Sequence, residues 1–124
     1  MLAACGGSSI VEPTDLNDQR VFFAFNSSEI SDEANDNLLG QSLYMKNHED
    51  VKIQIAGNCD ERGSTEYNLA LGARRANAAK SVIVNDGINA KRISTISYGK
   101  ERPLVKGTGE KVWKMNRNAT TTVK

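Results

Sequence analysis

Short β-strand patterns alternate with longer helical patterns along this chain of 124 residues. Residues 51–55 carry apolar side chains at the odd positions only, which is the two-residue period of a strand. The segment from Thr65 to the Asp86-Gly87 turn instead repeats small and apolar residues at helical spacing. This alternation predicts an α/β fold, an α+β two-layer sandwich with helices packed on one sheet. The length is sufficient for a single domain.

The first strand and helix are expected between residues 21 and 48. Residues 21–25 read VFFAF, an aromatic and β-branched run typical of a buried strand. Ser31 is expected to cap the following helix, whose first turn carries two acidic residues. The helix should end near residues 47–48. Its buried face is expected to contain Ala34, Leu38 and Met45.

The second half of the chain predicts the remaining elements. The strand at 51–55 should end at Gly57, and another strand is expected at 93–98. A loop over 99–108, a short helix over 110–116 and a Thr-rich closing strand over 119–123 follow. Small and apolar residues should pack the long helix closely onto the sheet: Leu71, Gly72, Ala76, Ala79 and Ile83.

Composition and charge exclude several classes of function. The 16 Lys and Arg residues exceed the 15 Asp and Glu residues by one, so a nucleic-acid partner is not expected. The segment from Lys100 onward is basic, which is typical of a solvated surface, although an anionic polymer is an alternative partner for it. Two cysteines and the single His48 cannot form a typical zinc site, so we expect neither a metal nor a cofactor.

The amino terminus resembles a lipoprotein processing site. Leu2-Ala-Ala-Cys5 matches the bacterial lipobox, and a Gly/Ser stretch follows the cysteine. Residues 1–4 are therefore expected to be the end of a signal peptide, Cys5 the lipidated residue, and residues 5–19 a tether. The alternative is an irregular terminus with an incidental cysteine. We expect no disulfide between Cys5 and Cys59.

Charged residues gather around the predicted strand-to-helix turn that follows residue 57. Asp60, Arg62 and Arg75 could present a carboxylate and guanidinium groups to a ligand that carries both charges. The helix amino terminus at this turn would add backbone N–H donors. The alternative from spacing alone is an Asp–Arg ion pair that only stabilises the turn.

Several motifs are similar to those of the OmpA-like peptidoglycan-binding domain family, and in particular to its peptidoglycan-associated lipoprotein branch. The resemblance extends from residue 20 to residue 124 and implies a β-α-β-α-β-β order on a mixed sheet. The matching motifs are VFFAFNSSEI (21–30), CDERG (59–63), YNLALG (67–72), RRAN (74–77), SYGKERP (97–103) and NR (116–117).

The resemblance implies binding to the meso-diaminopimelate residue of the peptidoglycan stem peptide. Asp60 would accept a hydrogen bond from the ligand ammonium, and Arg75 would bind its carboxylate bidentately. Asn26 and Asn68 match positions that line the same groove, and Arg62 is a candidate at its rim. Arg74 is expected to be a surface charge, and no residue is expected to be catalytic.

Three positions depart from the family pattern. Asn58 stands where a histidine is common, and Asn26 stands where an aspartate is frequent. Asn118 replaces the second arginine of an Asn-Arg-Arg motif. We expect these changes to tune ligand binding rather than abolish it.

The resemblance also implies a cellular role. It predicts an outer-membrane lipoprotein of the Tol–Pal system whose domain faces the periplasm, binds peptidoglycan and a TolB-like periplasmic protein, and supports envelope integrity and cell division. An OmpA-like anchoring domain of another envelope machine is the alternative. A cell-wall hydrolase using Cys59 or Asp60 is disfavoured, because the sequence offers the thiol no plausible general base.

Overall fold

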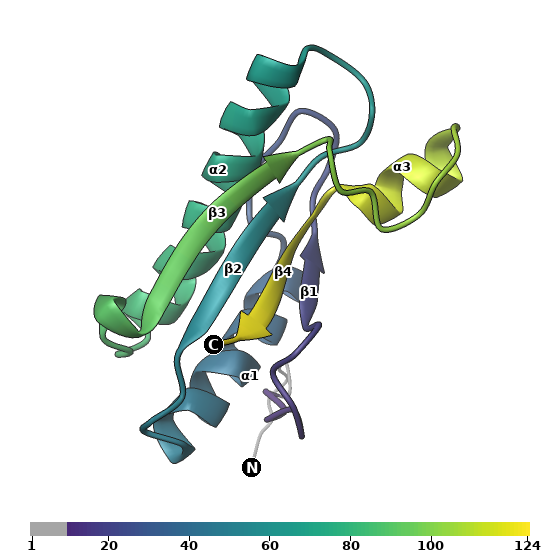
Figure 1. Cartoon of the computed structure of the whole chain (residues 1–124). Coiled ribbons are helices and arrows are strands. Elements are labelled where there is room, and N and C mark those ends of the chain that lie inside the picture. Colours follow the sequence, from purple (N-terminus) through teal and green to yellow (C-terminus); the bar gives the residue numbers. More distant parts are fainter. Residues whose placement is uncertain (1–9) are drawn as a thin grey trace.

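The computed structural model describes residues 10–124, and it contains four strands and three α-helices over this range. In chain order these are β1 (Arg20–Phe22), α1 (Asp32–Asn47), β2 (Ile53–Asn58), α2 (Thr65–Asn85), a 3-10 turn (Ala90–Arg92), β3 (Ile93–Gly99), α3 (Glu110–Asn116) and β4 (Asn118–Val123). The predicted fold class is confirmed. Figure 1 shows α1 and α2 together on one side of the sheet, while α3 extends from its end.

The sheet has the strand order β1-β4-β2-β3 and is mixed. β2 pairs in parallel with β3, as expected for strands joined through a helix. β4 inserts between β1 and β2 and is antiparallel to both. The final strand therefore links the first strand to the parallel pair, so one sheet supports both long helices (Figure 1).

The helices begin where the sequence predicts. The Ser31 hydroxyl accepts a hydrogen bond from the Ala34 amide at 3.1 Å and caps α1. The Ser64 hydroxyl accepts one from the Tyr67 amide at 3.0 Å and caps α2, which ends at Asn85. The residues predicted to face the sheet are buried, including Leu38, Met45 and Ile83.

β3 and β4 each differ from the prediction by one residue at one end, and β1 and β2 differ by more, since β2 begins at Ile53 rather than residue 51. β1 ends at Phe22, although the apolar run continues to Phe25, which is exposed. β2 does not end at Gly57 but continues to Asn58. A Cβ atom on Gly57 would collide with the carbonyl oxygen of Gly72 in α2. The glycine therefore permits close packing of helix on strand rather than forming a turn.

Part of the segment predicted as a tether packs against the domain. Leu16 is fully buried and belongs to the core. The Asp18 amide donates to the Thr121 carbonyl at 2.9 Å, and the Thr121 amide donates to the Gln19 carbonyl at 2.8 Å. The folded unit thus begins before residue 20. The predicted lipidation site Cys5 and the predicted signal-peptide end lie outside the described residues.

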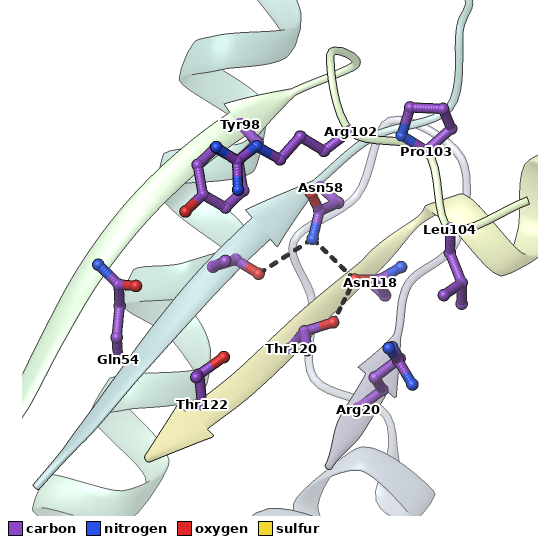
Figure 2. Close-up of a pocket in the computed structure, with 11 residues that line it drawn as sticks. Arg20, Gln54, Asn58, Tyr98, Arg102, Pro103, Leu104, Asn118, Thr120 and Thr122 are labelled. Carbon is purple, nitrogen blue, oxygen red and sulfur yellow. Dashed lines mark hydrogen bonds between the residues drawn. The ribbon is translucent and has the colours of Figure 1, made fainter. Parts of the chain in front are cut away.

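Within residues 10–124, no helix covers the sheet face opposite α1 and α2, and this face contains a pocket of about 380 Å³. Its floor consists of side chains from β2 and β4, and the loop after β3 forms one wall (Figure 2). The domain thus has one face that is buried under helices and one that is open.

Candidate functional site

The five residues predicted to bind a ligand come together just beyond the end of β2. They line one small cavity between the loop after β1, the β2–α2 loop and the first turns of α2. The lining residues are Phe25, Asn26, Cys59, Asp60, Arg62, Asn68, Leu71 and Arg75. Arg74 does not line this cavity and is exposed.

Local backbone geometry brings these loops together. Asn26 has φ 58°, a left-handed conformation that Asn tolerates better than most residues. Its side-chain oxygen accepts a hydrogen bond from the Tyr67 hydroxyl at 2.8 Å, which links the first loop to α2. Gly63, with φ 97°, provides the turn between β2 and α2. Two special backbone conformations thus shape the rim.

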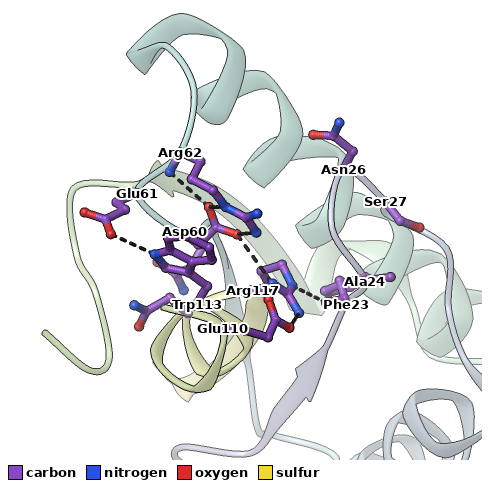
Figure 3. A network of polar contacts seen from close by, with 12 residues as sticks. Phe23, Ala24, Asn26, Ser27, Asp60, Glu61, Arg62, Glu110, Trp113 and Arg117 are labelled. Atoms are coloured by element: carbon purple, nitrogen blue, oxygen red, sulfur yellow. Dashed lines mark hydrogen bonds and ion pairs between the residues drawn. The ribbon is translucent and has the colours of Figure 1, made fainter. Parts of the chain in front are cut away.

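Asp60 is buried and its carboxylate is fully engaged. Arg62 donates to it through Nε at 3.1 Å, Nη2 at 2.8 Å and its backbone amide at 3.0 Å. Nη1 of Arg117 lies 3.5 Å from Oδ2 (Figure 3). Burial raises the pKa of Asp60, but the hydrogen bonds from Arg62 and the two positive charges outweigh burial and hold the pKa below its ordinary value.

Arg62 is inserted between two aromatic rings. Its guanidinium carbon lies 4.0 Å from the ring centroid of Phe25 and 4.0 Å from that of Trp113. Trp113 is itself fixed, since its indole Nε1 donates to Glu61 at 2.7 Å (Figure 3). Arg62 was predicted at the rim, and the structure adds that it binds the carboxylate of the same site.

Arg75 is 1% exposed and connects two loops. Its guanidinium donates to the carbonyls of Ser27 at 2.8 Å, Asn58 at 2.9 Å and Ala24 at 3.0 Å. Burial lowers the pKa of Arg75. The three bonds use three of the five guanidinium N–H groups, which leaves one N–H on each Nη nitrogen. In this structure Arg75 therefore supports the loops that form the cavity.

Asn68 and Cys59 close the floor of the cavity. The Asn68 side-chain Nδ2 donates to the backbone carbonyl of Arg62 at 2.8 Å. The Cys59 thiol donates to the backbone carbonyl of Asn68 at 3.2 Å. Burial raises the pKa of Cys59, so the thiol is neutral at physiological pH. A neutral, buried thiol is a poor nucleophile, and this chemistry does not favour a cysteine-dependent hydrolase.

Three residues of the site were not assigned a role from the sequence. They lie in or next to α3: Glu110, Trp113 and Arg117. Arg117 is buried and donates to the Phe23 carbonyl at 2.9 Å and to Glu110 at 2.9 Å. Trp113 stacks on Arg62. These contacts bridge distant parts of the chain, so spacing could not reveal them. The match of the Asn116-Arg117 pair to the family motif was the one available signal.

The cavity is closed in this structure. It holds about 10 Å³, which is about the space of one water molecule. Both carboxylate oxygens of Asp60 accept hydrogen bonds from Arg62. The Arg62 side chain would have to move for any other cation to bind this carboxylate.

Comparisons with known proteins identify the fold and the family. The OmpA family model matches residues 22–117. The chain belongs to the OmpA family. It is 42% identical over 121 residues to a peptidoglycan-associated lipoprotein of Mesorhizobium japonicum, covering 98% of this chain and 71% of the relative. It is 39% identical over 99 residues to the one of Haemophilus influenzae, covering 80% of this chain and 65% of the relative.

Solved structures agree with this assignment. The peptidoglycan-associated lipoprotein of Burkholderia pseudomallei superimposes with a TM-score of 0.83 at 37% identity, covering 86% of this chain and 90% of that one. The C-terminal domain of MotB from Helicobacter pylori has a TM-score of 0.76 at 18% identity, covering 89% and 86%. The likeness to MotB shows a shared fold alone.

The described residues provide neither a cluster of metal ligands nor a helix that could cross a membrane. No group of three or more His, Cys, Asp or Glu side chains in residues 10–124 could hold a metal ion. Over the same range, none of the helices combines the length and the apolar character needed to span a membrane.

Proposed function

We propose that this domain binds peptidoglycan non-covalently, through the meso-diaminopimelate residue of the stem peptide. The observation that carries the proposal is the convergence of a buried carboxylate and a buried guanidinium, from Asp60 and Arg75, on one cavity with Asn26, Asn68 and Arg62. The free end of diaminopimelate is an amino acid with an ammonium and a carboxylate. These two charges complement Asp60 and Arg75.

Binding would require an exchange of partners at Asp60. The ligand ammonium would replace the Arg62 guanidinium, which would leave its place between Phe25 and Trp113. The ligand carboxylate would then accept hydrogen bonds from the remaining N–H groups of Arg75. Tyr67, which now donates to Asn26, would lie at the edge of the opened cavity.

The decisive experiment compares two single-charge variants in a peptidoglycan pull-down. Asp60→Asn should weaken binding about ten- to a hundredfold, because a charge-assisted hydrogen bond contributes about 1.5–3 kcal/mol. Asp50→Asn makes the same change at an exposed aspartate between α1 and β2, away from the cavity, so it is the matched control and should bind like the wild type. Equal binding by wild type and Asp60→Asn would exclude the proposal.

Thermal unfolding separates ligand binding from a role in supporting the turn. If Asp60 only stabilises the turn through Arg62 and Arg117, Asp60→Asn should lower the melting temperature and the peptidoglycan binding to a similar degree. Asp60→Ala combined with Arg75→Ala should cost less binding than the sum of the single changes, since both side chains would hold the same small ligand. Full additivity would contradict a shared ligand.

We further propose a cellular role as an outer-membrane lipoprotein that links this membrane to the cell wall. Lipidation at Cys5, a domain that faces the periplasm and membership of the Tol–Pal system would together support envelope integrity and cell division. The names of the relatives support an anchoring role at the envelope. Full-length protein should incorporate radioactive palmitate, and Cys5→Ala should not. Equal labelling would refute the anchor.

A TolB-like periplasmic protein is the proposed protein partner. We place its binding at the turn of residues 59–63 and the loop of residues 98–103, which lie next to the cavity: Lys100 of that loop donates to the Gly63 carbonyl at 2.7 Å. A soluble stem peptide with diaminopimelate should then weaken binding of the TolB-like protein. Independent binding of the two would contradict a shared surface.

A further inference from the structure

The Arg62 guanidinium is held at Asp60 by two aromatic rings from distant parts of the chain. Its Nε and Nη2 donate to the Asp60 carboxylate at 3.1 Å and 2.8 Å. The ring centroids of Phe25 and Trp113 each lie 4.0 Å from the guanidinium carbon. Hydrogen bonds use the edge of a planar guanidinium and aromatic rings contact its faces, so both sets of contacts form together.

Trp113 contacts the turn after β2 at two successive residues. Its ring stacks on Arg62, and its indole Nε1 donates to a carboxylate oxygen of Glu61 at 2.7 Å (Figure 3). The hydrogen bond from Trp113 lowers the pKa of Glu61, so the acceptor is ionised at physiological pH. The hydrogen bond fixes the orientation of the indole, and the indole face then fixes the guanidinium.

Packing of the hydrophobic core does not explain the position of Trp113. Trp113 is partly exposed, and Asn116 is the one buried residue of α3. Within residues 10–124, the hydrophobic core contains no residue of α3, which extends from the end of the sheet (Figure 1). An element with so little buried surface can move without disrupting the core. The contacts with Glu61 and Arg62 are therefore the main specific contacts of this ring.

We propose that Trp113 is a positioning residue, which keeps Arg62 on Asp60 and thereby limits the access of a ligand cation to this carboxylate. Trp113 acts through Arg62 and does not contact the ligand. A ligand ammonium must displace Arg62, so each contact that stabilises Arg62 at Asp60 lowers the affinity for the ligand. The statement about affinity rests on the proposed function, whereas the positioning of Arg62 does not.

The first measurement uses side-chain NMR of the protein without a ligand. Ring currents should shift the Arg62 signals of the wild type away from those of exposed arginines. Trp113→Leu should move these signals part of the way back, and Trp113→Phe, which keeps a ring, should restore most of the shift. Burial raises the pKa of Asp60 and the hydrogen bonds from Arg62 lower it, so Trp113→Leu should also raise this pKa. Unchanged Arg62 signals in Trp113→Leu would overturn the inference.

Calorimetry with a soluble diaminopimelate stem peptide tests the effect on binding. Trp113→Leu should increase the affinity about fivefold, because one stacking contact with Arg62 is lost. The same change in an Arg62→Gln background should give no further increase, since Trp113 acts through Arg62. Met115→Leu, on the same helix and outside the cavity lining, is the control and should bind like the wild type. Weaker binding by Trp113→Leu, or an equal gain in both backgrounds, would mean that Trp113 acts on the ligand directly.

Glu61→Ala tests the positioning role without removing a ring. Glu61 is exposed, so the variant keeps the packing of the domain while the Trp113 indole loses its acceptor. The Arg62 signals should move in the same direction as in Trp113→Leu, by a smaller amount. Asp50→Ala, at an exposed acid outside the cavity lining, should leave them unchanged. Equal Arg62 signals in these two variants would contradict the inference. Failure of the stem peptide to bind any variant, with the expected Arg62 signals, would instead refute the proposed function alone.

Discussion

The two cavities near the end of β2 satisfy their polar groups in opposite ways. Asn58 lines the sheet-face pocket, and Asp60, two residues later, lines the closed cavity. Asp60 already binds one arginine closely and lies near a second, whereas Oδ1 of Asn58 accepts no hydrogen bond from residues 10–124. The closed cavity thus contains an internal cation that pairs with its carboxylate. In the sheet-face pocket, the described residues provide no such partner for the Asn58 oxygen.

This difference separates two routes to binding. At Asp60 the net free energy of binding would be the difference between the contacts of the ligand and the contacts of Arg62 that it replaces. The affinity would therefore depend on how strongly Arg62 binds Asp60. The sheet-face pocket already holds about 380 Å³ of space, so entry of a ligand there would not require such an exchange. The predictions below test whether the two regions respond separately, beginning with the largest expected effect.

Arg75→Ala should have the largest effect and should act on the closed cavity. It leaves the carbonyls of Ala24, Ser27 and Asn58 without their donor, which should cost about 3 kcal/mol or more of unfolding free energy. Urea denaturation measures this loss. The neighbouring and exposed Arg74→Ala is the control and should unfold like the wild type. Equal stability of both variants would show that the three bonds contribute little.

Gly57→Ala should affect both regions together. The added methyl would collide with the Gly72 carbonyl and force α2 away from β2, at a cost of about 2–3 kcal/mol. Amide NMR spectra should show changes at Asn58 and at Asp60 alike. Gly109→Ala has open space for a methyl and serves as a control for steric collision, although its φ of 101° carries its own backbone strain. Changes confined to one cavity would mean that the two move independently.

Local patterns predicted the helices well because their end signals are local. The Ser31 cap, the Asp86-Gly87 stop and the whole of α3 appear as expected. The residues that require long-range contacts were harder to predict. Leu16 lies in a polar stretch without periodicity, yet it is fully buried in the core.

The sequence predicted which residues line the cavity, but not which contacts these residues make with one another. Resemblance indicated Asp60, Arg75 and their neighbours, and the fold places them on one cavity. The spacing offered an Asp–Arg ion pair as an alternative, and Asp60 and Arg62 form one. The sequence could not show that Arg62 also stacks on Trp113 from α3, because this contact depends on how α3 packs. Nor could it show the unpaired oxygen of Asn58, which depends on the orientation of one amide.

Arg62→Gln should increase affinity for a soluble stem peptide about tenfold, equivalent to about 1.4 kcal/mol. The variant frees the Asp60 carboxylate from its internal partner, so the ligand ammonium no longer competes for it. Calorimetry measures the affinity. Lys106→Gln, an exposed cation that does not line the Asp60 cavity, is the control for net charge. A loss of affinity would show that Arg62 contacts the bound ligand instead.

The smallest expected effect is a pH dependence of stability that distinguishes the closed cavity from the sheet-face pocket. The pKa of Asp60 is below its ordinary value in the folded protein, despite burial, because of Arg62 and Arg117. A carboxyl of this kind stabilises the fold above its unfolded-state pKa of about 3.9, and this stabilisation is lost as the pH falls through the folded-state pKa. The gap in unfolding free energy between wild type and Asp60→Asn should therefore narrow as the pH is lowered below about 4. The stability of Arg102→Gln should run parallel to that of the wild type over the same range, since none of the described residues that line the sheet-face pocket is an acid. Parallel curves for wild type and Asp60→Asn would instead mean that Asp60 has the same pKa folded and unfolded, and the internal pairing that distinguishes the two cavities would contribute nothing to stability.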